Sequence, residues 1–136
     1  MSQVVINFWA VIAAAVSNMI LGAVWYSPAL FATQWMRLIG KSKEDIMKEG
    51  PGKAYGQAFV CALVTAYVFA HFIGYAGAST AVQGLQAGFW AWLGFVATTT
   101  AAMSIFEKRS WKLYAINNGY NLVSLMIMGV ILALWK

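Results

Sequence analysis

The side chains in this sequence that could do chemistry are mostly amides and hydroxyls set within long apolar stretches. The candidates for ligand binding are Asn18, Gln57, Thr99, Glu107, Asn117 and Asn121. A polar group surrounded by hydrocarbon is costly unless it finds a partner, so these residues indicate which helix faces point inward. Together they could bind the polar part of an amphipathic molecule. Alternatively, they could hold helices together through hydrogen bonds worth about 0.6 kcal/mol each.

Two further candidates are ionisable, and each has a plain structural alternative. Glu107 precedes Lys108 and Arg109, and a carboxylate beside two cations at a helix end is usually an interfacial ion pair. If Glu107 turns toward the asparagines at 117 or 121, it becomes the best candidate for binding a cation or an amine. His71 is the only histidine and has no acidic residue or cysteine nearby in sequence. It is a poor metal ligand on its own, so we expect a structural histidine, no metal and no cofactor.

No catalytic motif is visible in the sequence. It contains no nucleophile elbow, metalloprotease motif, phosphate-binding loop or dinucleotide-binding glycine pattern. The only aspartate, Asp45, lies in a charged loop. We therefore expect a protein that is not an enzyme. A membrane enzyme acting on lipid is the remote alternative, with Glu107 and His71 as its only acid and base, although these two residues are expected at opposite membrane faces.

Composition and hydropathy predict an integral membrane protein. The chain has 136 residues, of which 62% are hydrophobic and only 10% are charged. A spanning helix needs about 20 mostly apolar residues. The segments that meet this requirement are 4–26, 54–76, 82–106 and 113–135. We predict an all-α fold, a single membrane domain over residues 1–136, in which these segments form a left-handed four-helix bundle.

The positions of the basic residues predict how the chain is oriented. Lysines and arginines gather in the 27–53 and 107–112 loops, and only Lys136 lies on the other side. Basic loops face the cytoplasm. We therefore expect a bacterial inner-membrane protein with both termini outside the cytoplasm. The formal charge of +5 is explained by orientation and by membrane lipids as partners, and nucleic acid is not expected.

The 27–53 loop contains an interfacial segment over residues 28–49. Ser27 could cap a helix that has Pro28 at its first position, and Gly40 would end it. The apolar residues on one face of that helix are Phe31, Trp35, Leu38 and Ile39. Such a helix would lie in the headgroup region with this face toward the lipid. A second short helix is expected, because Ser42 and Asp45 approximate a capping box.

Small residues and tryptophans predict helix contacts. Gly84-x-x-x-Gly88 favours close helix approach, and packing within the chain and dimerisation are equally good interpretations. Trp90 and Trp92 lie within the third span and are expected to face lipid or another subunit. Because so small a chain buries little helix surface, we expect a homodimer.

Several short motifs resemble one family. They are Asn7-Phe8-Trp9, the run from Leu21 to Pro28 with Trp-Tyr-Ser-Pro at its end, Phe31 with Trp35-Met36, the run from Gly94 to Thr98, Phe106-Glu107 with Arg109, Asn118-Gly119-Tyr120 with Ser124, and the run from Met128 to Trp135. The chain thereby resembles the small bacterial membrane proteins called the domain of unknown function 1761 family. The resemblance covers nearly the whole chain and implies a four-span membrane protein, without supplying a reaction.

These observations favour a non-enzymatic binder or transporter of a lipid or small amphipathic molecule. Its pocket would lie in the cytoplasmic half of the bundle, where the candidate residues converge. An accessory or structural subunit of a membrane complex is the main alternative, with the 28–40 helix and the Gly84/Gly88 face as its contacts. A proton-coupled exporter is disfavoured, since no glutamate lies within a span.

Overall fold

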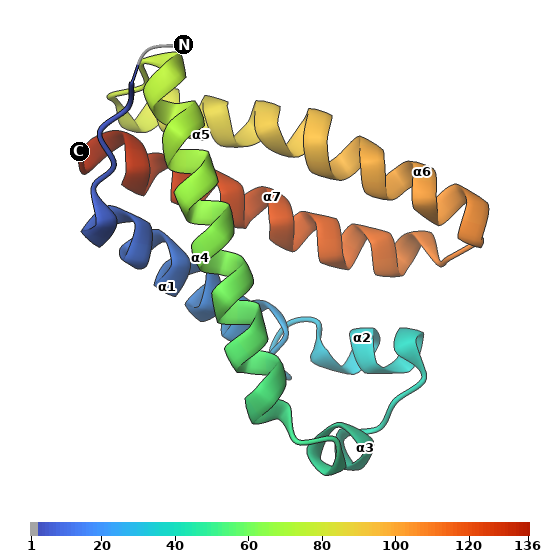
Figure 1. Ribbon diagram of the computed structural model, residues 1–136. Coiled ribbons are helices and arrows are strands. Elements are labelled where there is room, and N and C mark those ends of the chain that lie inside the picture. The colour runs from blue at the N-terminus through green and yellow to red at the C-terminus, as the bar shows by residue number, and fades with distance from the viewer. Residues whose placement is uncertain (1–2) are drawn as a thin grey trace.

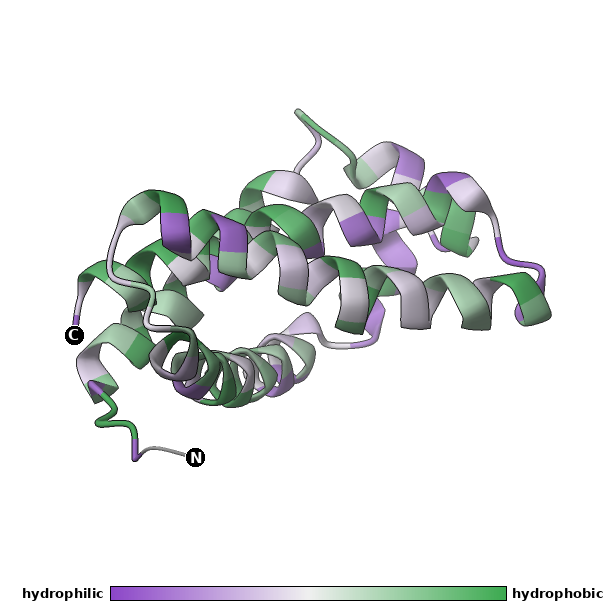
Figure 2. Ribbon diagram, turned by 90° about the horizontal axis from the view of Figure 1, so that it is seen from above, coloured by the Kyte–Doolittle hydropathy of each residue, from purple (hydrophilic) through white to green (hydrophobic). Residues whose placement is uncertain are grey.

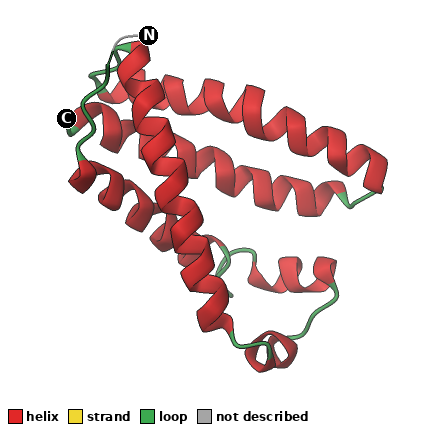
Figure 3. Cartoon of the chain, in the orientation of Figure 1, coloured by secondary structure: helices red, strands yellow, loops and turns green. Residues whose placement is uncertain are grey.

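The computed structural model describes residues 3–136, and all regular structure in that range is helical (Figure 3). The all-α prediction is confirmed. The elements are α1 (Phe8–Trp25), α2 (Ala32–Ile39), α3 (Lys43–Lys48), α4 (Pro51–Ala76), α5 (Ala81–Ala91), the π-helical segment η1 (Trp92–Ala97), α6 (Thr98–Glu107) and α7 (Trp111–Leu134).

Among residues 3–136, four helices are long and apolar enough to cross a membrane, as predicted for a membrane protein. They are α1, α4, the continuous helix Ala81–Glu107 made of α5, η1 and α6, and α7. The first begins a few residues later than predicted because Asn7 caps it. The Asn7 side chain accepts hydrogen bonds from the backbone N–H groups of Trp9 (3.0 Å) and Ala10 (3.4 Å), which satisfies donors that a helix start leaves free.

The long helices run between two ends of the molecule (Figures 1 and 2). One end, here called the terminal end, holds the described start of the chain, its C-terminus and the turn at 77–80. The other, called the basic end, holds α2, α3 and the turn at 108–110. Helix α7 is central: it packs against α5 and α1, and α1 also packs against α4.

Glycines set the closest helix contact, which joins α5 to α7. A Cβ atom added to Gly88 would lie 2.7 Å from the carbonyl carbon of Leu125, and one added to Gly84 would lie 2.6 Å from that of Gly129. Only glycine lets two helix backbones approach so closely. The Gly84/Gly88 face is therefore used for packing within the chain, as one of the two interpretations predicted, and a contact with another subunit stays untested.

The apolar core lies between α1, α4 and α7. Ala14, Ala66 and Met128 are fully buried, and Ile73 is nearly so. Alanines at these positions let α1 approach α4 and α7 closely. The core extends toward the terminal end, where Leu132 and Ala78 belong to the same cluster.

The third span diverges from this core in its second half. Its π-helical segment η1 separates α5, which packs tightly on α7, from α6, in which no residue is buried. Only Ala97 of η1 is buried. Single-turn π segments inside α-helices are frequent at functional sites. The result is a gap between α6 and α7 toward the basic end, bridged by side chains.

The interfacial segment forms two short helices, but the first starts later than predicted. Ser27 does not cap it: its hydroxyl donates to the carbonyl of Val24 (2.7 Å), and its own carbonyl accepts from the N–H groups of Leu30 and Ala32. Residues 27–31 are thus a turn that redirects the chain after α1, which is why α2 begins at Ala32. Gly40 ends α2 in a left-handed conformation (φ 74°), as predicted.

Aromatic packing places the apolar face of α2 against the rest of the protein. Trp35 lies edge-on to Tyr26 (5.4 Å between ring centroids), and Phe31 packs on Trp25 (5.0 Å). Trp35, Leu38 and Ile39 are all half-buried. The apolar face is therefore present as predicted, and at Phe31 and Trp35 it packs on the end of α1. That it faces lipid stays a prediction.

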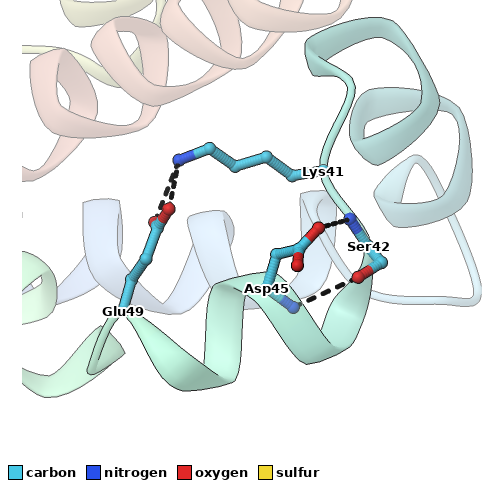
Figure 4. Close-up of polar contacts among 4 residues, drawn as sticks. All are labelled: Lys41, Ser42, Asp45 and Glu49. Atoms are coloured by element: carbon cyan, nitrogen blue, oxygen red, sulfur yellow. Dashed lines mark hydrogen bonds and ion pairs between the residues drawn. The ribbon is translucent and has the colours of Figure 1, made fainter.

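The predicted capping box at the start of α3 is confirmed (Figure 4). The backbone N–H of Ser42 donates to the Asp45 carboxylate (3.0 Å), and the backbone N–H of Asp45 donates to the Ser42 hydroxyl (3.1 Å). These bonds lower the pKa of Asp45, chiefly through the backbone donor of Ser42. Lys41 and Glu49 form an ion pair across the same helix (2.8 Å), so α3 is fixed at both ends.

Candidate functional site

A groove of about 220 Å³ lies between α6 and α7 toward the basic end. Most of its lining residues carry a polar side chain, although the larger part of its surface is apolar. Its lining residues are Thr100, Met103, Ser104, Glu107, Arg109, Ser110, Leu113, Tyr114, Asn117, Asn118 and Asn121. Both helices contribute hydroxyls, carboxamides or charges, which is the arrangement expected of a site that orients the polar part of a ligand.

Three of the predicted ligand-binding residues line this groove, namely Glu107, Asn117 and Asn121. Asn117 and Asn121 are one helical turn apart on α7 and are half-buried. Glu107 is the last residue of α6 and is exposed. The carboxylate and both amides therefore share one groove, as the interpretation of Glu107 as a binding residue required.

Asn18, by contrast, lies on the other side of α7. Its amide donates to the Ser124 hydroxyl (2.6 Å), and its side-chain carbonyl accepts from the Tyr120 hydroxyl (2.6 Å). Tyr120 also donates to the backbone carbonyl of Asn18 (2.9 Å). These bonds lock α1 to α7. Asn18 thus matches the alternative interpretation, in which polar residues hold the helices together.

Gln57 and Thr99 do not reach the groove either. Gln57 is exposed on α4, a helix packed on α1 rather than on α6. Thr99 is exposed on α6, and its hydroxyl donates to the carbonyls of Phe95 and Val96 in its own helix. A threonine satisfied by the preceding turn can face lipid at little cost.

Tyr26 connects the groove to the end of α1. Its hydroxyl donates to the side-chain carbonyl of Asn117 (2.7 Å), while its ring contacts both Trp35 of α2 and Tyr120 of α7. Beside it, the indole N–H of Trp25 donates to the backbone carbonyl of Ile116 (2.9 Å). The Asn117 amide is therefore held in one orientation, with its NH2 group left to the groove.

Asn118 forms the buried wall of the groove. Its side-chain carbonyl accepts from the Thr100 hydroxyl (3.1 Å), and its amide donates to the backbone carbonyl of Tyr114 (3.2 Å). The hydroxyl of Tyr114 in turn donates to the carbonyl of Ala97 (2.6 Å). These bonds hold η1 and the start of α6 against α7. Between these bonds and the turn at 108–110, α6 diverges from α7.

The prediction that Trp92 faces lipid or another subunit is wrong. Its indole N–H donates to the backbone carbonyl of Asn118 (2.9 Å), so it packs within the chain. Only Trp90, 66% exposed, faces outward as predicted.

An ion pair closes the end of the groove. The Arg109 Nε forms an ion pair with one oxygen of the Glu107 carboxylate, and both residues line the groove. The pair forms because Lys108 ends α6 in a left-handed conformation (φ 55°), the only non-glycine residue with positive φ among those described. The interpretation of Glu107 as an interfacial ion pair is therefore confirmed, while its role in binding a cation or an amine stays a prediction.

His71 lies far from this groove. It is half-buried in the last two turns of α4. Its Nδ1 is 2.9 Å from the carbonyl of Tyr67, and its ring lies between those of Tyr67 and Tyr75. Within residues 3–136 no three His, Cys, Asp or Glu side chains are grouped so that they could hold a metal ion.

Sequence reasoning missed part of the groove: Thr100, Ser104, Arg109, Ser110, Tyr114 and Asn118 were not among its candidates. A signal for two of them exists on α7. Tyr114, Asn118 and Asn121 recur at intervals of four and three residues, which is one helix face, whereas Tyr120 and Ser124 share a different face.

The fold of the described residues defines a class: an all-helical protein with four helices long and apolar enough to cross a membrane. The chain belongs to the family described as Protein of unknown function (DUF1761), whose model matches residues 9–133. This match confirms the resemblance seen in the sequence. Comparison with curated proteins and with solved structures gave no match.

Proposed function

We propose that this protein is a non-enzymatic binder or transporter of a lipid or small amphipathic molecule, and that the ligand's polar part occupies the α6–α7 groove. The observation that carries the proposal is the groove itself. Polar groups from two helices line it, although every other face of α6 is apolar or satisfied within its own helix.

The divergence of α6 from α7 suits a ligand that enters sideways from the bilayer. The α5 half of the span is fixed to α7 by the glycine contacts, and Asn118 fixes η1. Beyond that point α6 has no buried residue. An acyl chain could therefore leave the groove along α6 without crossing a packed interface.

We also propose in which membrane the protein lies and which of its ends faces the cytoplasm. The basic end, with α2, α3 and the groove, faces the cytoplasm of a bacterial inner membrane, and both termini face outward. The separation of the basic loops from the termini supports this (Figure 1), since basic loops stay on the cytoplasmic side. The four spans act as one bundle, with a homodimer as the assembled form.

Native mass spectrometry of wild type and of two asparagine variants tests the proposal. Asn121→Leu removes a groove amide that has no hydrogen bond to the described residues, whereas Asn18→Leu removes an amide from the α1–α7 contact. The chemical change is the same in both. We expect wild type and Asn18→Leu to retain a non-protein mass after purification in mild detergent, and Asn121→Leu to lose it.

Helix content measured by circular dichroism shows whether each variant is folded. The proposal is wrong if wild type retains no mass, or if a folded Asn121→Leu retains it unchanged. Loss from Asn18→Leu alone would place the ligand at the α1–α7 contact instead.

A structural or accessory subunit is the second candidate, and one observation favours it. The third span is the least buried of the four, with large side chains such as Trp90, Phe95 and Phe106 exposed. A partner membrane protein could cover this face. Co-purification of such a partner, lost on Phe95→Ala and kept on Asn121→Leu, would support that role.

A further inference from the structure

Glu107 and Arg109 close the groove with opposite charges, and each keeps unused hydrogen-bonding capacity. Arg109 is paired with the carboxylate through Nε, and its side chain is 63% exposed, which leaves its two terminal nitrogens accessible to a ligand. Glu107 is bonded through one carboxylate oxygen, and its side chain is 44% exposed. A guanidinium fork of this kind matches a phosphate, and a carboxylate oxygen matches an ammonium group.

The position of Glu107 is electrostatically unfavourable for a carboxylate. It is the last residue of α6, where the partial negative charge of the helix end repels a carboxylate. The next residue, Lys108, holds a left-handed conformation (φ 55°) that brings Arg109 back over Glu107. Features that oppose local preference are expected at functional sites.

The groove is large enough for a lipid headgroup. Its volume is about 220 Å³, which is enough for a phosphate joined to a two-carbon amine. The tails would have to lie outside. Met103 and Phe106, 59% and 87% exposed, offer them an apolar surface on α6.

We propose that the groove binds a phospholipid whose headgroup carries a primary amine, with the phosphate at Arg109 and the ammonium group at Glu107. This inference names the ligand class of the proposed function and rests on it. The Asn121 amide also lines the groove, one helical turn from Asn117. A primary ammonium has three N–H donors, whereas a trimethylated one has none and cannot make these bonds.

A methylation series tests the inference on the wild-type protein. The delipidated protein is incubated with phosphatidylethanolamine, its N-methyl and N,N-dimethyl forms, and phosphatidylcholine, all with the same acyl chains. Retention is measured by native mass spectrometry. We expect it to fall at each methylation step and to be at least about tenfold lower for phosphatidylcholine, since charge-assisted hydrogen bonds are lost. Phosphatidylglycerol, an anionic phospholipid, is run alongside.

A matched pair of variants locates the selectivity. Glu107→Gln should abolish the preference for the primary amine, while Glu49→Gln should keep it. Glu49 also forms an ion pair on the protein surface, with Lys41 at 2.8 Å, but lies in the interfacial segment rather than in the groove. Arg109→Gln should weaken all phospholipids alike, because it removes the phosphate contact.

The outcomes separate this inference from the proposed function. Equal retention along the methylation series, or stronger retention of phosphatidylglycerol, would overturn the primary-amine inference and leave a lipid-binding groove in place. Retention of no phospholipid while another mass stays bound would also overturn it. If wild type retains nothing at all, the proposed function itself fails.

Discussion

Asp45 makes the start of α3 sensitive to acid. Its pKa is lowered, first by the backbone N–H of Ser42 and then by the Ser42 hydroxyl. A carboxyl group with a lowered pKa in the folded state contributes stability above its ordinary pKa and loses it as pH falls through the lowered value. We therefore expect α3 to fray only below the usual titration range of an aspartate.

The backbone amide signal of Ser42 in NMR spectra reports this transition, since that group donates to Asp45. Its titration should have a midpoint below the ordinary aspartate range and should vanish in Asp45→Asn. A midpoint within or above that range would contradict the capping geometry.

Lys108 offers a second prediction at this scale. It is held at φ 55°, a conformation that costs a residue with a side chain about 1 kcal/mol or more and costs glycine little. Lys108→Gly should therefore raise the free energy of unfolding by about 1 kcal/mol. Thermal unfolding in detergent measures it, with Lys112→Gly as the control. Because Lys112 lies in the first turn of α7, that substitution should destabilise. A loss of stability in Lys108→Gly would show that this turn is not strained.

Two asparagines show that the sequence predicts which residues are buried but not which neighbours they contact. Asn18 and Asn121 were both predicted to be inward and polar, and both are half-buried. Hydrophobic patterning predicts that they avoid lipid, but not which neighbour they meet. The Asn18 amide meets Ser124 and Tyr120, whereas Asn121 faces the groove. That difference depends on tertiary packing alone.

At the scale of elements, the contact between α5 and α7 depends on glycine. A Cβ atom at Gly88 would lie 2.7 Å from backbone atoms of α7, whereas one at Gly94 would meet nothing within 4 Å. Gly88→Ala should destabilise the protein by about 2 kcal/mol, because two backbones must move apart. Gly94→Ala adds the same methyl group and should be neutral or slightly stabilising.

Thermal unfolding of both alanine variants checks this prediction. Equal stability of the two variants would mean that α5 and α7 do not approach each other as described. A Gly88→Ala variant that stays stable but changes its oligomeric state would mean that this face joins two copies of the chain.

The four spans were predictable because crossing a membrane requires about 20 apolar residues whatever the neighbours are. The packing of those spans was not, because lipid tails are as apolar as leucine and a lipid-facing surface resembles a packed one. Trp90 and Trp92 illustrate this. They are two residues apart in the same span, yet Trp90 is exposed and Trp92 donates to a carbonyl of α7. The π-helical turn between α5 and α6 had no signal in the sequence either.

At the scale of the whole molecule, the proposed orientation can be tested with single cysteines. Cys61 is the only natural cysteine, so Cys61→Ala gives a cysteine-free background. Ser79→Cys lies in the turn at the terminal end, and Ser42→Cys and Ser110→Cys lie at the basic end. In intact cells a membrane-impermeant maleimide should label only position 79. Labelling of 42 and 110 without 79 would reverse the orientation.

The groove was predicted in part, at the level of the whole chain. The sequence placed Glu107, Asn117 and Asn121 in the same half of the membrane, because their depth follows from the span limits. It could not show that α6 diverges from α7, which is what creates the space. That divergence results from the glycine contacts of α5, the π-helical turn and the bonds of Asn118.

The central claim is that a ligand occupies the space between α6 and α7, and site-specific photo-crosslinking tests it most directly. A photoreactive residue is placed at Met103 or Leu113, which line the groove, and at Val60, which is 59% exposed on α4. The protein is purified in mild detergent, irradiated and weighed by mass spectrometry. We predict a lipid-sized adduct from positions 103 and 113 and none from position 60. Adducts of equal yield at all three positions, or none at 103 and 113, would contradict the proposed site.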